Sequence, residues 1–134
     1  MQLVVLLAVQ GLCFAVLDAV MLTRVMQPLF RQHIGHLMLD GLRIGPAVGF
    51  YALYIAGLTI LVSLPALRAG SLLQAAAGGA ILGAVAYGTY ELTSHTIMKD
   101  WDIRMVVTDM AWGTFLSALT ATVGVFAARA VGQG

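Results

Sequence analysis

Residues 72–92 read LLQAAAGGAILGAVAYGTYEL, and this stretch decides the fold class. It is apolar almost throughout, has a single charged residue, Glu91, and contains no proline. An α-helix of roughly 20 residues spans about 30 Å, the thickness of the hydrocarbon core of a bilayer. Lipid offers the backbone no hydrogen-bond partners, whereas a helix satisfies its own N–H and C=O groups. The stretch therefore predicts a transmembrane helix.

Three other stretches of the 134-residue chain have the same length and character. We place the four predicted spans at residues 3–23, 45–66, 72–92 and 106–127. Hydrophobic residues make up 60% of the chain and charged residues only 10%, whereas a soluble domain has about 25% charged residues. We therefore expect an all-α integral membrane protein, a single four-helix transmembrane domain over residues 1–134, with membrane lipid around it. The net charge of +1 argues against nucleic acid as a partner.

Only the connection at residues 24–44 is long enough to have structure of its own. Pro28 suits the first turn of a helix. Apolar residues recur there at helical spacing: Met26, Phe30, Ile34 and Leu37. We therefore expect a short amphipathic helix that lies in the membrane interface between the first and second spans. An irregular loop broken by Gly35 and Gly41 is the alternative.

The positively charged residues are distributed unevenly between the two ends of the predicted spans. Five flank the first and third connections, which share one side: Arg24, Arg31, Arg43, Lys99 and Arg104. Two, Arg68 and Arg129, lie on the side of the amino end. Because Lys and Arg are enriched in cytoplasmic loops, we expect the first and third connections in the cytoplasm and both termini outside it.

Three acidic residues fall within the predicted spans, all near the cytoplasmic end: Asp18, Glu91 and Asp109. A charged residue at a helix centre costs roughly 2.5–3.5 kcal/mol on insertion, so such residues usually face the protein interior and serve a function. Two interpretations are open. In one, the acids pair with bases such as Lys99 and Arg104 and fix the bundle. In the other, they form a site for an ion, a proton or a lipid headgroup.

The third and fourth spans carry small residues at four-residue spacing, which lets membrane helices approach closely. The two ridges are Ala75, Gly79, Gly83, Tyr87 and Glu91 on one span, and Asp109, Gly113, Ser117 and Ala121 on the other. Antiparallel packing of these ridges would bring Glu91 towards Asp109. Tyr87 could then donate a hydrogen bond to Glu91, and Trp112 lies beside Asp109. If the acids form a site and do not pair with bases, the two carboxyl groups would share a proton, with Asp18 as a candidate third member.

No nucleotide-binding loop, zinc-ligand spacing or Ser/His/Asp arrangement occurs in the sequence. His33 and His36 stand three residues apart, and we interpret them as polar groups at the interface rather than metal ligands. We therefore predict no catalytic residues, no metal and no cofactor.

Three strings add to this pattern: YGTYELT at 87–93, KDW at 99–101 and VTDMAWGT at 107–114. Together with Asp18, Pro46-Ala47 and LPALRAGS at 64–71, they resemble a family of small bacterial membrane proteins catalogued as domain of unknown function 2177. The chain departs from the family at Ser94-His95, where members tend to have Asn-Leu, and at Asp100, where a glycine is usual. The resemblance implies a four-helix membrane protein, for which we expect the bacterial inner membrane, and implies no known activity.

Three classes of function are therefore open. We favour a non-enzymatic membrane component with an acidic ion- or proton-binding site on the cytoplasmic side. An accessory or assembly subunit of a homo-oligomer or larger membrane complex is the alternative, with small-residue surfaces as contacts. An enzyme acting on lipid headgroups is least supported, because it needs a nucleophile or metal constellation. The polar residues of the other half of the bundle mark no obvious transport path: Gln10, Thr59, Ser63 and Thr120.

Overall fold

The structure is a computed structural model that describes residues 1–39 and 43–132, and every regular element within these ranges is helical. The first long helix comprises α1 (Gln2–Met21), the π-helical turn η1 (Leu22–Met26), α2 (Gln27–Ile34) and the 3-10 turn η2 (Gly35–Leu37). The second comprises α3 (Ile44–Leu58), the π-helical turn η3 (Thr59–Ser63) and α4 (Leu64–Ala69). The third and fourth are α5 (Leu72–Ile97) and α6 (Ile103–Gly132).

Four continuous helices are long and apolar enough to cross a membrane: Gln2–Leu37, Ile44–Ala69, Leu72–Ile97 and Ile103–Gly132. They confirm the all-α fold class with four helices that could cross a membrane, and each of the four predicted spans lies within one of these helices. Each helix is longer than the span predicted for it, since polar residues at the ends extend the helices beyond their apolar stretches. The connections are correspondingly shorter than predicted.

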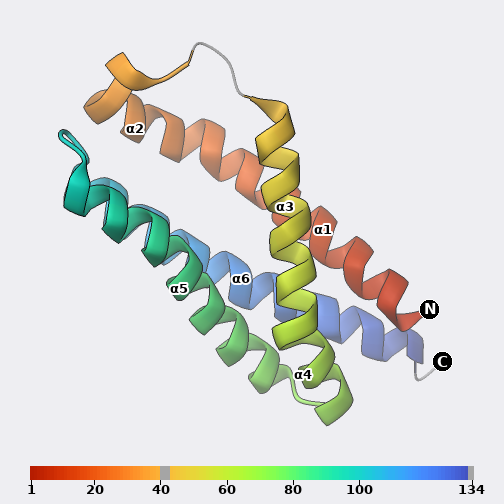
Figure 1. Ribbon diagram of the computed structural model, residues 1–134. Coiled ribbons are helices and arrows are strands. Elements are labelled where there is room, and N and C mark those ends of the chain that lie inside the picture. The colour runs from red at the N-terminus through yellow and green to blue at the C-terminus, as the bar shows by residue number, and fades with distance from the viewer. Residues whose placement is uncertain (40–42, 133–134) are drawn as a thin grey trace.

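The segment after the first span differs most from the prediction. α2 is helical, with Pro28 in its first turn, but it continues α1 through η1 without a break (Figure 1). A separate helix in the membrane interface is therefore not confirmed. The alternative, a loop broken at Gly35, does not describe the segment either, because Gly35 lies in the turn η2. Gly41 lies outside the described residues.

Both π-helical turns end two residues before a proline. η1 precedes Pro28 and η3 precedes Pro65. A proline has no N–H to donate, and its ring collides with the carbonyl four residues earlier in a regular α-helix. At the end of each π-helical turn an N–H bonds the carbonyl five residues back, Gln27 to Leu22 and Leu64 to Thr59, which widens the helix there. The wider turn accommodates the ring, so each helix continues through its proline.

The four long helices form an antiparallel bundle in which one member leans away. α5 and α6 make the most extensive contact, and α1 packs along α6 (Figure 1). Both termini and the α4–α5 turn lie at one end, and the other two connections lie at the opposite end. α3 crosses the bundle, and its first half stands apart from α5, with Ile44 63% and Val48 59% exposed.

α5 and α6 approach so closely that their glycines leave no room for a side chain. A Cβ atom added to Gly83 would lie 2.3 Å from the Gly113 carbonyl oxygen, and one added to Gly79 would lie 2.6 Å from the carbonyl oxygen of Ser117. The Tyr87 ring packs over Gly113, where an added Cβ would lie 2.2 Å from the ring. The residues predicted for helix packing therefore lie at the contact between the two backbones. This contact sets the position of the acids one to two turns further along.

Candidate functional site

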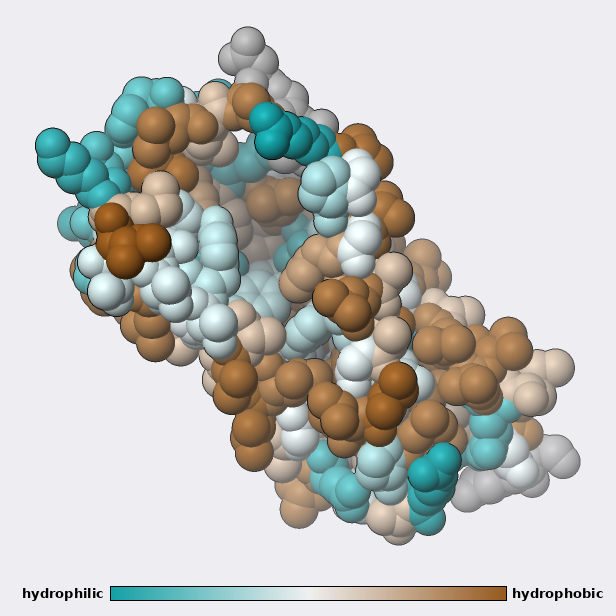
Figure 2. Space-filling view, viewed as in Figure 1, coloured by the Kyte–Doolittle hydropathy of each residue, from teal (hydrophilic) through white to brown (hydrophobic). Residues whose placement is uncertain are grey.

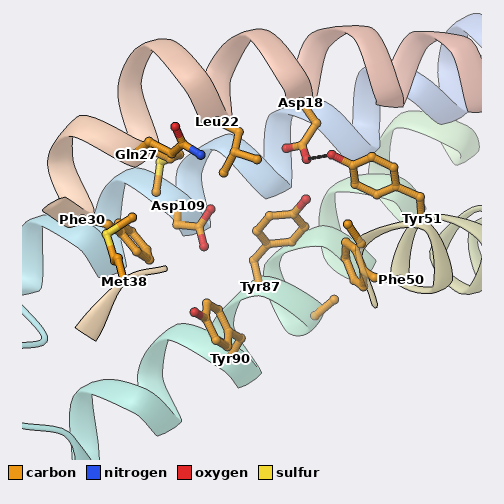
Figure 3. Close-up of a pocket in the computed structure, with 13 residues that line it drawn as sticks. Asp18, Leu22, Gln27, Phe30, Met38, Phe50, Tyr51, Tyr87, Tyr90 and Asp109 are labelled. Atoms are coloured by element: carbon orange, nitrogen blue, oxygen red, sulfur yellow. Dashed lines mark hydrogen bonds between the residues drawn. The ribbon is translucent and has the colours of Figure 1, made fainter. Parts of the chain in front are cut away.

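Asp18 joins three helices. Its carboxyl group on α1 accepts a hydrogen bond from the Tyr51 hydroxyl of α3, at 2.5 Å (Figure 3). It also accepts one from the Trp112 Nε1–H of α6, at 3.1 Å. The sequence pointed to Trp112 as a neighbour of Asp109, and nothing in the sequence pointed to Tyr51 as a partner of Asp18. Both side chains instead hold the Asp18 carboxylate in one orientation.

Glu91 is fully buried on α5, and its two carboxyl oxygens differ in their surroundings. The Trp101 Nε1–H donates to Oε1 at 3.0 Å, whereas Oε2 has no hydrogen-bond partner among the described residues. The carboxyl group of Asp109 on α6 is its neighbouring ionisable group. No hydrogen bond joins Tyr87 to Glu91 in the described part of the chain, so the expected donor is replaced by Trp101.

Trp101 reaches Glu91 because its position in the α5–α6 connection is fixed from several sides. Its backbone carbonyl lies 2.6 Å from His95 Nδ1. Its ring packs edge-on against Phe30 of α2 and Tyr90 of α5, with ring centroids 5.3 and 5.5 Å apart. The side chain is only 6% exposed. The string KDW did contain this residue, but nothing in its spacing pointed to Glu91.

A cavity of about 550 Å³ lies between α1, α2, α3, α5 and α6, and Asp18 and Asp109 are both in its wall. In Figure 3 their carboxyl groups point towards the ring of Tyr87, which rises from α5 between them. Most of the remaining wall is apolar, and it includes five aromatic side chains: Phe30, Phe50, Tyr51, Tyr87 and Tyr90. The space-filling view is hollowed on its side face, where the first half of α3 stands away from α5 (Figure 2).

The acids of the site have no basic partner within the described residues. Lys99 and Arg104, which the sequence offered as counter-ions, form no ion pair with Asp18, Glu91 or Asp109 there. Two histidine–aspartate contacts in the described chain join α2 and its following turn to the α5–α6 connection, His33 to Asp102 at 3.8 Å and His36 to Asp100 at 3.5 Å.

A second cavity, of about 520 Å³, lies beside these pairs at the tip of the bundle. Its wall includes His33, His95 and Asp102. In the described part of the chain no three His, Cys, Asp or Glu side chains are placed to hold a metal ion.

The polar residues of the opposite half of the bundle are buried and hydrogen-bonded, three of them around Gln10 and the others in separate pairs. Gln10 Nε2 donates to Thr59 Oγ1 at 2.7 Å, and the Ser63 hydroxyl donates to Gln10 Oε1. Thr120 lies near Cys13 at 3.8 Å, and the Tyr54 hydroxyl lies 2.5 Å from that of Ser117. The bonds to Thr59 and Ser63 satisfy the Gln10 amide in the interior of the bundle, where an unpaired polar group is costly.

Four apolar helices that gather acidic side chains inside a bundle define the class of a multi-pass, all-α membrane protein. Within this class, the chain belongs to the family described as "Predicted membrane protein (DUF2177)", whose model matches residues 3–126. The resemblance found in the sequence is thereby confirmed. Comparisons with curated proteins and with solved structures gave no match. The family description assigns no activity, so the function has to be argued from the site.

Proposed function

We propose that this chain is a non-enzymatic component of the bacterial inner membrane that binds a cation or a proton at Asp18, Glu91 and Asp109. One observation carries the proposal: three helices contribute acids to one cluster, and none of the described Lys or Arg residues pairs with them. The alternative interpretation requires each acid to neutralise a buried Lys or Arg. No such pair is found among the described residues, so this interpretation is not supported.

A bound cation or proton would offset what this arrangement costs. Carboxylates removed from water lose several kcal/mol of hydration each, and neighbouring carboxylates repel one another. The unpartnered Oε2 of the fully buried Glu91 adds a further cost, since a buried acceptor without a donor is destabilising. A proton shared by Glu91 and Asp109 would supply a donor and remove one negative charge. A cation in the adjoining cavity would offset the charge of Asp109 and Asp18.

The same proposal includes the orientation in the membrane. The excess of Lys and Arg around the first and third connections, five against two, supports a cytoplasmic position for that end of the bundle. The acids lie towards the same end, so the proposed site is reached from the cytoplasmic half of the bilayer.

Infrared spectroscopy of the purified protein near pH 7 tests the shared proton. A protonated carboxyl group gives a C=O band that is distinct from the carboxylate bands. We expect this band in the parent protein and expect both Glu91→Gln and Asp109→Asn to change its position or intensity, because each variant removes one member of the pair. Asp100→Asn is the matched control, since Asp100 is exposed to solvent at the tip of the bundle, and it should leave the band unchanged.

The stability of Asp109→Asn provides a second measurement on the same sample. Removing the partner of a buried base typically costs about 3–5 kcal/mol. Because no base is paired with Asp109, we expect its asparagine variant to unfold at nearly the parent temperature. A parent protein without the protonated band, together with a strongly destabilised Asp109→Asn variant, would contradict the shared proton.

A second function, that of an accessory subunit or homo-oligomer, is favoured by the outer surface of α3. Gly45, Gly49 and Gly57 have no atom within 4 Å of the place where a Cβ would stand, so a methyl group added at these positions of α3 would have open space around it. Such surfaces suit close helix contacts in lipid. Native purification followed by mass measurement tests this function: a defined oligomer or stoichiometric complex supports it, and a monomer contradicts it.

A further inference from the structure

The main cavity has the size of a small-molecule site. Its volume of about 550 Å³ lies within the usual range of roughly 300–1,000 Å³ for such sites. A bare inorganic cation fills only a small fraction of this space and needs about six oxygen ligands close around it. Most of the cavity wall consists of carbon, so it cannot provide such a shell.

The charged residues of the cavity wall indicate that a molecule bound there is positively charged. Asp18 and Asp109 both line the cavity, and none of the described residues in its wall is a lysine, arginine or histidine. Asp18 is held in place by Tyr51 and Trp112, so its charge is fixed at one side of the cavity before anything binds. An anion or a phosphate group would meet repulsion without any compensating base.

The aromatic side chains favour an organic cation over a metal ion. Five rings line the cavity, among them Phe50 of α3 and Tyr87 and Tyr90 of α5. The face of an aromatic ring attracts a positive charge, and quaternary ammonium groups are typically bound by several rings at once. A carboxylate together with aromatic faces therefore suits an organic cation that cannot donate hydrogen bonds better than it suits a hydrated metal ion.

The opening of the cavity indicates where such a molecule enters. The hollow lies on the side of the bundle, where α3 stands away from α5 (Figure 2). Phe50 and Tyr90 are 43% and 52% exposed, and they belong to these two helices. An opening between two membrane-spanning helices faces lipid rather than water. A molecule that arrives this way has to be soluble in lipid.

We infer that the cavity binds a lipophilic organic monocation, with its positive charge between Asp18, Asp109 and the aromatic rings and its apolar body towards the opening between α3 and α5. The inference rests on the proposed cation-binding function and names the class of ligand that this site takes.

Titration calorimetry with tetraphenylphosphonium, a lipophilic quaternary cation, tests the inference on the full chain in detergent. We expect saturable binding to the parent, and binding weaker by about tenfold or more in Asp109→Asn, since a buried charge partner is lost. Phe50→Ala should also weaken binding while both carboxylates stay in place, which separates the aromatic contribution from the charge. Asp100→Asn removes a carboxylate at the exposed tip and should bind like the parent.

Three further results bear on the outcome. Tetraphenylborate, which has nearly the same shape and the opposite charge, should not bind. Binding that is equal in the parent and in Asp109→Asn would show mere partitioning into an apolar surface and would overturn the inference. Preferential binding of sodium or magnesium chloride over tetraphenylphosphonium would also overturn it, while leaving the proposed cation site intact. The infrared measurement on Glu91 and Asp109 is independent of this titration, so the two proposals can fail separately.

Discussion

Asp100 lies in the connection between α5 and α6 with a backbone φ of +67°. This left-handed conformation costs an L-amino acid with a Cβ roughly 1–2 kcal/mol, whereas glycine adopts it without steric penalty. Aspartate is among the residues that tolerate it best. The glycine that the family resemblance implies for this position would therefore have a direct conformational reason. The turn keeps its shape with aspartate, and it places the next residue, Trp101, against Glu91.

We predict that Asp100→Gly leaves the protein equally stable or stabilises it by up to about 1 kcal/mol. Relief of the left-handed strain is partly offset by the greater backbone entropy of glycine in the unfolded chain. The pair with His36 that is lost is more than half exposed on both sides, so it contributes little. Thermal unfolding in detergent measures the effect.

Asp100→Val is the matched comparison at the same position. A β-branched residue is strongly disfavoured at positive φ, so this variant should unfold at a lower temperature than both the parent and Asp100→Gly. A valine variant as stable as the glycine variant would contradict a left-handed backbone conformation at position 100.

At the scale of the helices, the close contact between α5 and α6 depends on glycines, which have a hydrogen atom where other residues have a Cβ. The added Cβ at Gly83 would stand 2.3 Å from a backbone oxygen of α6, and backbone cannot move aside as a side chain can. In lipid, close van der Waals packing is a principal attraction between helices. The two helices would have to separate along the contact to admit even one methyl group.

We therefore predict that Gly83→Ala destabilises the bundle by about 1–3 kcal/mol, the usual cost of overpacking. Gly57→Ala is the matched control, because the same methyl group on α3 would meet no atom within 4 Å. That variant should be as stable as the parent or slightly more stable, since alanine favours helix. Equal thermal unfolding of the two variants would mean that α5 and α6 are not in contact through Gly83.

The helices were predictable from sequence because their signal is local, whereas most partners of the acids were not. Hydropathy over some 20 residues marks each span, and four-residue spacing marks the ridges of α5 and α6, which a short connection forces together. The partner of Asp18 on α3, Tyr51, depends on how α1 and α3 cross, and no periodicity records this angle. The same holds for Gln10, whose hydroxyl partners Thr59 and Ser63 lie on η3.

The first long helix also shows why a proline misleads a sequence-based boundary. Pro28 is compatible with the start of a new helix, and this led to the prediction of a separate interfacial segment. η1 absorbs the steric conflict before Pro28, so the helix continues. A wider turn before a proline has no residue pattern of its own, and it shows only in the backbone hydrogen bonds.

For the molecule as a whole, the length of the helices determines how much of it extends beyond the hydrocarbon core of the bilayer. Gln2–Leu37 has 36 residues, which corresponds to about 54 Å, against roughly 30 Å of hydrocarbon. The charged part of this helix lies at its α2 end. There Ile34 packs with Trp101, Met105 and Val106 in one buried cluster. The helix end and the α5–α6 connection thus form one structured cap at the end opposite the termini.

The last prediction places this cap in the cytoplasm. The cap region and its flanks hold five of the seven Lys and Arg residues, and such an excess is retained on the cytoplasmic side during insertion. In a Cys13→Ala background, His36→Cys and Ala69→Cys each introduce one exposed thiol, at the cap and at the α4–α5 turn respectively. A membrane-impermeant maleimide added to intact spheroplasts should modify position 69 at once and position 36 only after permeabilisation. Neither substitution changes the count of Lys and Arg, so the signal that sets the orientation is preserved. Labelling of position 36 alone in intact spheroplasts would reverse the orientation, and the acidic cavity would then lie towards the outer face of the membrane.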